Sequence, residues 1–468
     1  MRFTYPHVGR AAFALPALLL SGVLLSGCAT LSQDGGFDAV AQSSKSRTGL
    51  ATHLLRNADD ERALAADIDK KLAQPLSADG AVQIALLNNR SLQATYWSLG
   101  IAEADLVQAG RLQNPSFDFK HSQGGGAVVI ERTLTFNLVN LLTAPLAARI
   151  EAGRYEETKL LVADAAFKVA NDTRRAYIDA VAALQSVNYA RQVDSSAEAS
   201  AELGEQMRHA GNWSQLDLAR AQAYHAQTEA DVIHAGQVAM AAREKLTRLM
   251  GLTGPQASNY VLPDHLPDLP NAAIELADVE PAAMRDRLDI QAATLATQHT
   301  AAALGLTRTT RFINVLDLGA VDNSSSGVPA ARGYELTLEI PLFDWGDARV
   351  ARAQASYMQS VNRLAETAIN ARSEARLSYA DYRAAYDLAR RYRDHVLPLR
   401  KQIADETLLR YNGMLLSVFE LLADAREQAV TVNAYIAALK DYWIAQTNLD
   451  AALGGRLPAA PNTNGAPQ

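Results

Sequence analysis

The chain has 468 residues, of which 49% are hydrophobic and 20% charged, and its formal net charge is −7. This composition predicts an ordered protein with a sizeable core, and the mildly acidic balance gives no sign of nucleic-acid binding. Because Cys28 is the only cysteine, an internal disulfide and a multi-cysteine metal site are both excluded.

Residues 1–27 have the pattern of a lipoprotein signal peptide. Two arginines precede an apolar stretch from Ala11 to Leu25, which has the length of a signal-peptide core. The motif Leu25-Ser26-Gly27-Cys28 then resembles a bacterial lipobox, in which the cysteine is lipidated and becomes the first mature residue. A signal peptide with a chance cysteine is the alternative, but the position of the sole cysteine favours lipidation. The resemblance implies the outer membrane, because Ala29 follows instead of an aspartate.

Residues 28–75 are polar and mixed, and we interpret them as an N-terminal tether. Residues 76–252 are predicted as a first structural repeat. It begins with a helix to Leu112 that Ser77 caps, followed by a β-hairpin in which apolar and polar residues alternate on both sides of the glycines 124–126. After the signal peptide the sequence has no run of about 18 or more apolar residues, so it predicts no transmembrane helix.

A long helical hairpin completes this repeat. Its first helix is predicted from Pro145 to Gly211, which is roughly 65 residues and so about 100 Å. The second helix returns from Ser214 to Gly251. A straight helix of that length does not fit inside a compact globular domain.

The second half of the chain repeats this plan. Residues 253–272 form a proline-rich linker, and residues 273–455 again predict a helix, two strands, a long helix and a returning helix that ends at Gly454. Pro398 lies within the long helix and should bend it. Residues 456–468 are predicted to be a disordered tail.

Each long helix carries a stripe of small residues with the alternating spacing of a coiled-coil seam. The two stripes are in register, because 364 − 162 = 202 and 389 − 187 = 202. They are Val162, Ala166, Val169, Thr173, Ala176, Ala180, Ala183 and Val187, and then Leu364, Ala368, Ala371, Ala375, Ser378, Tyr382, Ala385 and Ala389. Arg174 and Tyr177 match Arg376 and Tyr379 at the same offset, so the repeat is an internal duplication.

The predicted strands number four per chain, and they alternate as the wall of a membrane barrel does. Four strands cannot close such a barrel, whose smallest forms have about eight. Strands that lie in a membrane must therefore be closed by further copies of the chain, and two or three copies are both permitted. The alternative is a small soluble sheet that caps the helices.

Several motifs together resemble the TolC family of outer-membrane efflux proteins, and the lipobox fits its lipoprotein branch. The motifs are Glu339-Ile340-Pro341-Leu342-Phe343-Asp344-Trp345-Gly346, Val396-Leu397-Pro398-Leu399, Arg410-Tyr411-Asn412-Gly413, Phe419-Glu420-Leu421-Leu422 and Leu449-Asp450-Ala451-Ala452-Leu453-Gly454.

The resemblance implies a mainly α-helical fold with a small membrane β part. Three copies would form one 12-stranded barrel, continued by a periplasmic helical barrel. The function implied is a passive exit duct of a tripartite efflux or type I secretion-like system, with a periplasmic adaptor and an inner-membrane pump as partners. We expect no enzyme activity and no cofactor beyond the lipid on Cys28. The other function considered is a periplasmic coiled-coil adaptor or structural lipoprotein, which would normally carry a further β-rich domain.

The resemblance also implies candidate site residues. The strand-to-helix signature is Pro341, Leu342, Phe343, Asp344 and Gly346, and the helical turns lie at Gly211 and Gly413. Tyr411 and Glu420 are candidates for the pore gate. Asp424 and Asp217 are weaker candidates, for which an ordinary solvated position on a helix is the favoured interpretation.

The turn after Gly413 departs from the best-known family pattern. Met414-Leu415-Leu416 follows, with no basic residue to pair across the gate. This apolar run is interpreted either as an adaptor-docking tip or as helix core. The histidines are scattered without ligand spacing, and no catalytic constellation is present in the sequence.

Overall fold

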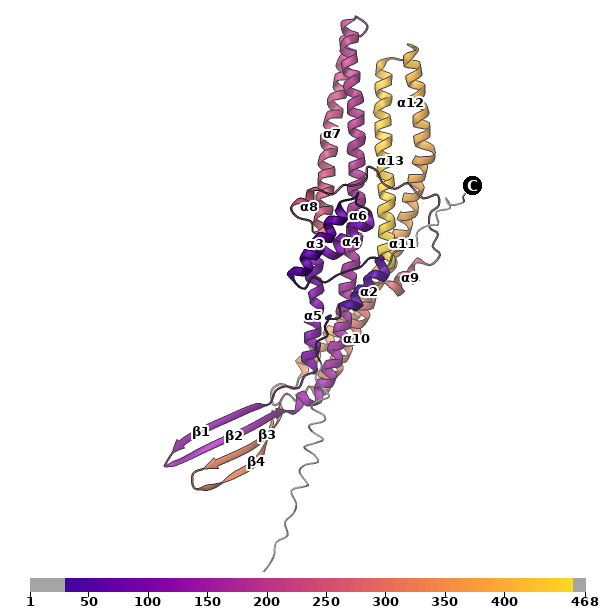
Figure 1. The fold of residues 1–468 in the computed structure, drawn as a ribbon. Coiled ribbons are helices and arrows are strands. Elements are labelled where there is room, and N and C mark those ends of the chain that lie inside the picture. The colour runs from indigo at the N-terminus through magenta and orange to yellow at the C-terminus, as the bar shows by residue number, and fades with distance from the viewer. Residues whose placement is uncertain (1–29, 458–468) are drawn as a thin grey trace, which may run out of the picture. The chain divides into compact units, whose positions relative to one another are not determined.

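The computed structural model describes residues 30–457 (Figure 1), so the predicted signal peptide, Cys28 and the residues after 457 lie outside it. The chain forms two compact units, and each draws on both repeats. The sheet unit takes residues 30–36, Ser98–Lys159 and Ala292–Leu364. The helical unit takes Phe37–Trp97, Leu160–Gln291 and residues 365–457.

The sheet unit holds four antiparallel strands, paired in chain order. They are β1 (Ser116–Gly124), β2 (Ala127–Asn137), β3 (Leu316–Ser325) and β4 (Val328–Leu338). Gly125 and Gly126 have φ values of +60° and +83°, which the tight turn between β1 and β2 requires. Among the described residues, β1 and β4 each pair along one edge only. The predicted hairpins are confirmed.

The register gives the sheet one apolar and one polar face. Residues directly opposite each other on paired strands share a face. Phe117, Leu134 and Tyr334 lie in one row across the sheet, whereas Asp118 and Thr133 lie on the other face. The predicted alternation is therefore present in all four strands.

Helices make up most of the described chain, as the sequence predicted. Their bounds are α2 (Phe37–Thr48), α3 (Ala58–Leu72), α4 (Ala78–Asn88), α5 (Arg90–Gly110), α6 (Leu138–His209), α7 (Gln215–Met250), α8 (Pro255–Ser258), α9 (Val279–Asp286), α10 (Leu288–Thr310), α11 (Asp347–Arg391), α12 (Leu397–Asn412) and α13 (Val418–Leu453). The small-residue stripes are packing faces, because Ala166 and Ala176 of α6 and Ala371 and Ala375 of α11 are fully buried.

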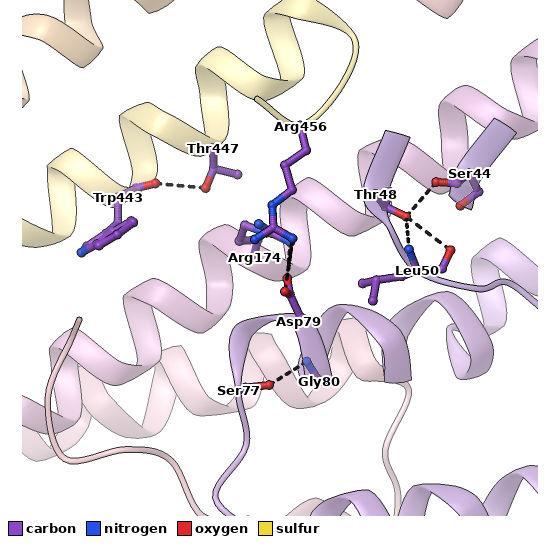
Figure 2. Close-up of polar contacts among 10 residues, drawn as sticks. All are labelled: Ser44, Thr48, Leu50, Ser77, Asp79, Gly80, Arg174, Trp443, Thr447 and Arg456. Atoms are coloured by element: carbon purple, nitrogen blue, oxygen red, sulfur yellow. Dashed lines mark hydrogen bonds and ion pairs between the residues drawn. The ribbon is translucent and has the colours of Figure 1, made fainter. Parts of the chain in front are cut away.

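The matched Arg and Tyr residues of the duplication tie each repeat's first short helix to its long helix. Arg174 of α6 pairs with Asp79 of α4 at 2.6 Å, and Arg456 joins the same carboxylate at 3.2 Å (Figure 2). In the second repeat, Arg376 of α11 pairs with Glu280 of α9 at 2.8 Å. The duplication therefore preserves contacts as well as residue types.

The tyrosines act in the same way. Tyr177 donates a hydrogen bond to the carbonyl of Leu76 at 2.8 Å, and the Tyr379 hydroxyl accepts one from the amide of Leu276 at 3.2 Å. Each bond holds the segment that leads into the first helix of its repeat.

The returning helices end at glycines, as predicted, and these glycines allow close packing. Gly251 and Gly454 have φ values of +66° and +78°. A Cβ added at Gly251 would lie 2.5 Å from the carbonyl oxygen of Asn88, and one at Gly454 would lie 2.8 Å from that of Asp286. In both repeats the returning helix thus ends against the end of the first short helix.

Each predicted first helix is in fact two helices. The helix predicted from Leu76 to Leu112 breaks at Asn89, whose extended ψ of 116° separates α4 from α5. The helix predicted from Pro281 to Arg308 breaks at Arg287, whose ψ is 130°. Asn89 was a readable signal of the first break, because asparagine is a preferred N-cap and its side chain accepts from the Leu92 amide at 3.0 Å. Arg287 is not a capping residue type, so the second break had no such signal.

Pro145 lies inside its helix, which differs from the prediction, and the helix around Pro398 contains an irregular turn. α6 begins at Leu138 and contains Pro145, rather than starting there. Before Pro398 the helix widens into one π-helical turn, Tyr392–Val396, where the Leu397 amide bonds to the carbonyl of Tyr392. A widened turn accommodates the proline ring and its missing N–H, so the chain continues into α12.

Much of the predicted tether is folded onto the helical unit. Phe37 of α2 packs edge-on against the ring of Tyr96 at 5.0 Å, and both are buried. The Gln83 side chain donates to the carbonyl of Ala51 at 2.7 Å, and that of Gln93 accepts from the amide of Leu55 at 3.0 Å. These contacts order the stretch between α2 and α3.

Candidate pore gate at the ends of the helical hairpins

The predicted turns lie where α6 meets α7, which we call the first hairpin, and where α12 meets α13, the second hairpin. Gly211 adopts a φ of +80°, as expected for a glycine turn. In the second hairpin the left-handed position is Met414, with a φ of +59°, whereas Gly413 has a φ of −78°. Met414 is 94% exposed and Leu415 76%, so neither is helix core in this chain.

Asp217 and Glu420 occupy equivalent positions at the starts of the returning helices. Each is the third residue of a capping box, in which Ser214 and Ser417 are the respective N-caps. Hydrogen bonds from these serines hold the pKa of both carboxyls below their usual values, with a contribution from Arg220 at Asp217. Both carboxylates are therefore ionised at neutral pH. The sequence spacing Ser-x-x-Asp/Glu is typical of a capping box, but it was not used to predict one at these two positions.

Asp424 has a partner within its own hairpin. Its Oδ1 lies 3.0 Å from the Nη2 of Arg400 on α12, and Arg400 also donates to the Asp424 carbonyl at 3.1 Å. Both side chains are mostly buried. Asp424 is thus a link between α12 and α13 rather than a freely solvated residue.

Tyr411 belongs to an apolar cluster that joins both hairpins. Helices α6, α7 and α13 contribute its buried residues, and Tyr411 packs against it from α12, so all four hairpin helices meet here. The buried members are Ala197, Ala221, Tyr224, Val418 and Leu422, and Val193, Trp213 and Tyr411 pack against them. We call these residues the tip cluster.

Two arginine–aromatic contacts connect α7 to α13 beside the tip cluster. The Arg220 guanidinium of α7 lies 4.7 Å from the Phe419 ring centroid of α13. In the opposite direction, the Arg426 guanidinium of α13 lies 4.7 Å from the Tyr224 ring centroid of α7. These contacts supply basic groups between the hairpins, although the sequence offered none directly after Gly413.

The strand-to-helix signature forms a tight connection from β4 to α11. Gly346 has a φ of +74°, and an added Cβ would lie 2.5 Å from the carbonyl oxygen of Arg311. Asp344 accepts a hydrogen bond from the Gly346 amide at 2.8 Å, and Trp345 packs edge-on against Phe312 at 6.3 Å. Phe343 is 99% exposed. In this chain the signature therefore combines a required glycine turn with an exposed aromatic.

Residues 30–457 contain no helix that is both long and apolar enough to cross a membrane. Nor do they hold a group of three or more His, Cys, Asp or Glu side chains arranged to bind a metal ion.

Solved structures with the same architecture include outer-membrane channels. A membrane protein from Pseudomonas aeruginosa is 21% identical, with a TM-score of 0.70 over 81% of this chain and 93% of its own. The outer-membrane channel OprN is 20% identical, with a TM-score of 0.69 over 82% and 91%. The chain has the fold of outer-membrane channels.

The open state of the Neisseria gonorrhoeae MtrE outer-membrane channel shares this channel fold, with 18% identity and a TM-score of 0.65 over 80% of this chain and 88% of its own. No family model and no curated protein matches the sequence. The predicted resemblance to the TolC family is thus confirmed for the fold. The gate assignments of Tyr411, Glu420, Asp424 and Asp217 stay predictions.

Proposed function

We propose that this protein is an outer-membrane exit duct, which passively conducts solutes delivered by a periplasmic adaptor and an inner-membrane pump. The observation that carries this proposal is a sheet with an apolar face whose outer strands, β1 and β4, each leave one edge unpaired within residues 30–457. Unpaired strand edges favour pairing with another chain. In a membrane such pairing becomes necessary, because lipid offers no hydrogen-bond partners.

The strand directions support closure by identical copies. In an antiparallel sheet of four strands, β1 and β4 run in opposite directions. The β4 edge of one copy can therefore take the β1 edge of the next without breaking the antiparallel order. Three copies would close a barrel of twelve strands, above the minimum of about eight.

The helical hairpins would form the periplasmic duct, and their ends its gate. Asp217 and Glu420 are both ionised, so each chain would bring two negative charges to the entrance, favouring cations. The exposed Met414 and Leu415 would be the contact for the adaptor, because an apolar pair at a turn gains most by being covered. A lipid on Cys28 would anchor the chain to the outer membrane.

Reconstitution tests the proposal directly. The protein extracted from outer-membrane fractions should run as a heat-modifiable trimer and give discrete conductance steps in planar bilayers. A monomer without conductance would refute the exit duct and favour the adaptor or structural lipoprotein. Incorporation of labelled palmitate, abolished by Cys28→Ser, tests the anchor separately.

The gate assignment has its own test. Glu420→Gln removes the charge but keeps a capping box, since glutamine serves at this position as well as glutamate. We expect a lower cation-to-anion permeability ratio with an unchanged trimer. Glu61→Gln on α3 is the matched control, because it removes the same charge outside the hairpins. Equal ion selectivity in both variants would remove Glu420 from the gate.

A further inference from the structure

A charged row follows the continuous apolar rows of the sheet, and beyond it Ile130 and Val128 lie on the same face among polar neighbours. From the helical end outward, the paired rows of this face are Leu316–Leu338, then Phe136–Leu318–Leu336, then Phe117–Leu134–Ala320–Tyr334, and then Phe119–Arg132–Asp322–Arg332. The first three rows are apolar apart from the tyrosine hydroxyl. The fourth carries two guanidinium groups and one carboxylate on the same face.

The charges in this row do not cancel. Arg132 Nη1 lies 3.1 Å from Asp322 Oδ1, and Arg332 Nε lies 3.0 Å from Asp322 Oδ2. Two cations share one anion, which leaves this row with a net charge of +1 in each copy of the chain. Each guanidinium has five N–H donors, so most of them remain beyond the one that bonds Asp322. The pair is thus suited to bind a further anion.

The height of the row matches a membrane interface. The series of apolar side chains begins at Ile340, where the neighbouring Glu339 amide still bonds to the Val315 carbonyl at 3.2 Å. The eight steps from Ile340 to Arg332 span about 26 Å along a strand. With a barrel tilt of about 40° this becomes about 20 Å across the membrane, close to the apolar band of outer-membrane barrels.

Aromatic residues mark the same level. Phe117 and Tyr334 lie in the row just below the charges, and Phe119 lies in the charged row itself. Aromatic girdles of this kind sit at the interfaces of membrane barrels. The charged row lies toward the strand turns, away from the strand ends that lead into the helices, so in the proposed duct it faces the outer leaflet.

We propose that Arg132 and Arg332 form a binding site for a phosphate group of an outer-leaflet lipid, one site on each chain. Arginine suits this role because its planar donors match phosphate oxygens in a two-point contact. Asp322 holds both guanidiniums in place and spaces them. This inference rests on the proposed exit duct, because only membrane insertion brings the row to the headgroups.

Lipid retention by the intact trimer tests the site. The trimer is reconstituted in phosphatidylcholine vesicles with and without lipid A, re-extracted, and its bound lipid A counted by native mass spectrometry. For Arg132→Gln/Arg332→Gln we expect at least about tenfold less retention than in the unmodified chain, because the loss of even one of the two charge-assisted contacts corresponds to about tenfold. Arg132→Lys/Arg332→Lys keeps the charges and should restore much of the retention.

Lys120→Gln is the matched control for the single variant Arg332→Gln. Lys120 also pairs with a carboxylate, Glu131 at 3.3 Å, but on the polar face of the same sheet. It should retain lipid A like the unmodified chain. Equal retention in Arg332→Gln and Lys120→Gln would overturn the site, as would displacement of lipid A by equimolar inorganic phosphate.

The two proposals fail in distinguishable ways. If the unmodified chain forms no conducting trimer, the exit duct is refuted. If the trimer conducts but lipid A retention is the same in the double glutamine variant, only the lipid site is refuted.

Discussion

The arginine–aromatic contacts between α7 and α13 make a sharp prediction about gating. The double variant Phe419→Leu/Arg426→Gln removes both contacts, because one change deletes the ring under Arg220 and the other deletes the cation over Tyr224. The apolar tip cluster stays in place, since leucine keeps much of the packing of Phe419. The variant therefore loosens the link between the hairpins without emptying the core beneath it.

The size of the effect follows from the number of contacts. Cation–π contacts at exposed sites contribute about 0.5–1 kcal/mol each, so two contribute about 1–2 kcal/mol per chain. This corresponds to an increase of about 5- to 30-fold in the equilibrium constant for separating the hairpins of one chain. We expect the open probability in planar bilayers to rise accordingly, with little change in the thermal stability of the trimer.

A matched variant guards against a general effect of losing arginine. Arg390→Gln removes a cation 5.7 Å from the Tyr386 ring, but both residues lie on α11 and connect no hairpins. Its open probability should equal that of the unmodified protein. If the double variant also stays within about twofold, a change of less than 0.5 kcal/mol, these contacts do not restrain the gate.

Three further predictions concern stability and are read from thermal unfolding. Gly251→Ala should cost about 2–4 kcal/mol, from left-handed strain and the clash with Asn88, whereas Gly211→Ala, with open space around it, should cost only about 1 kcal/mol; equal losses would refute the clash. Burial raises the pKa of Asp450 from 3.8 to about 6, so its ionisation opposes folding, and stability falls as the pH rises from about 4 to about 6 and then levels off. Asp450→Asn should therefore stabilise the protein by up to about 3 kcal/mol at pH 7 and by nothing below pH 4, and a pH-independent difference would contradict this. Arg47→Ala should cost about 1.5–3 kcal/mol through lost bonds to backbone carbonyls, and an unchanged melting temperature would show that they contribute nothing.

Sequence patterns predicted structural features best where a local backbone requirement can be met by only a few residue types. Ser77, Gly251 and Gly454 were placed correctly as caps, because an N-cap oxygen and a left-handed C-cap each have few alternatives. The faces of the strands followed from alternation, since a shift of one residue would reverse them. The offset of 202 located equivalent contacts such as Arg174 and Arg376.

Features that depend on tertiary contacts could not be predicted. The breaks at Asn89 and Arg287 occur where a returning helix ends. Asparagine is a preferred N-cap, and Asn89 caps α5 through the Leu92 amide, whereas Arg287 is not a capping residue type. The partner of Asp424 is Arg400, which is 24 residues earlier and is brought close by the hairpin turn. The predicted turn at Gly413 is present, since Gly413 is the C-cap of α12, but the left-handed residue is Met414, against its own preference.

In both repeats, backbone carbonyls at the end of the returning helix accept hydrogen bonds from a side chain. The donor differs between the repeats, and in the second repeat it comes from the N-terminal segment. In the first repeat, Asn88 lies beside Gly251 and donates to the carbonyls of Met250 and Gly251 at 3.0 and 2.8 Å. Asp286 lies in the corresponding place beside Gly454, but a carboxylate has no N–H to donate.

Arg47 supplies the missing donor. Its Nη1 bonds to the carbonyls of Asp286, at 2.6 Å, and of Gly454. The change from asparagine to aspartate at this position therefore makes the second repeat depend on the segment between the predicted lipid site and the first repeat. In a chain anchored through Cys28, residues 29–36 would connect the lipid to α2. The contacts of Arg47 would then fix this N-terminal segment to the second repeat within the helical unit.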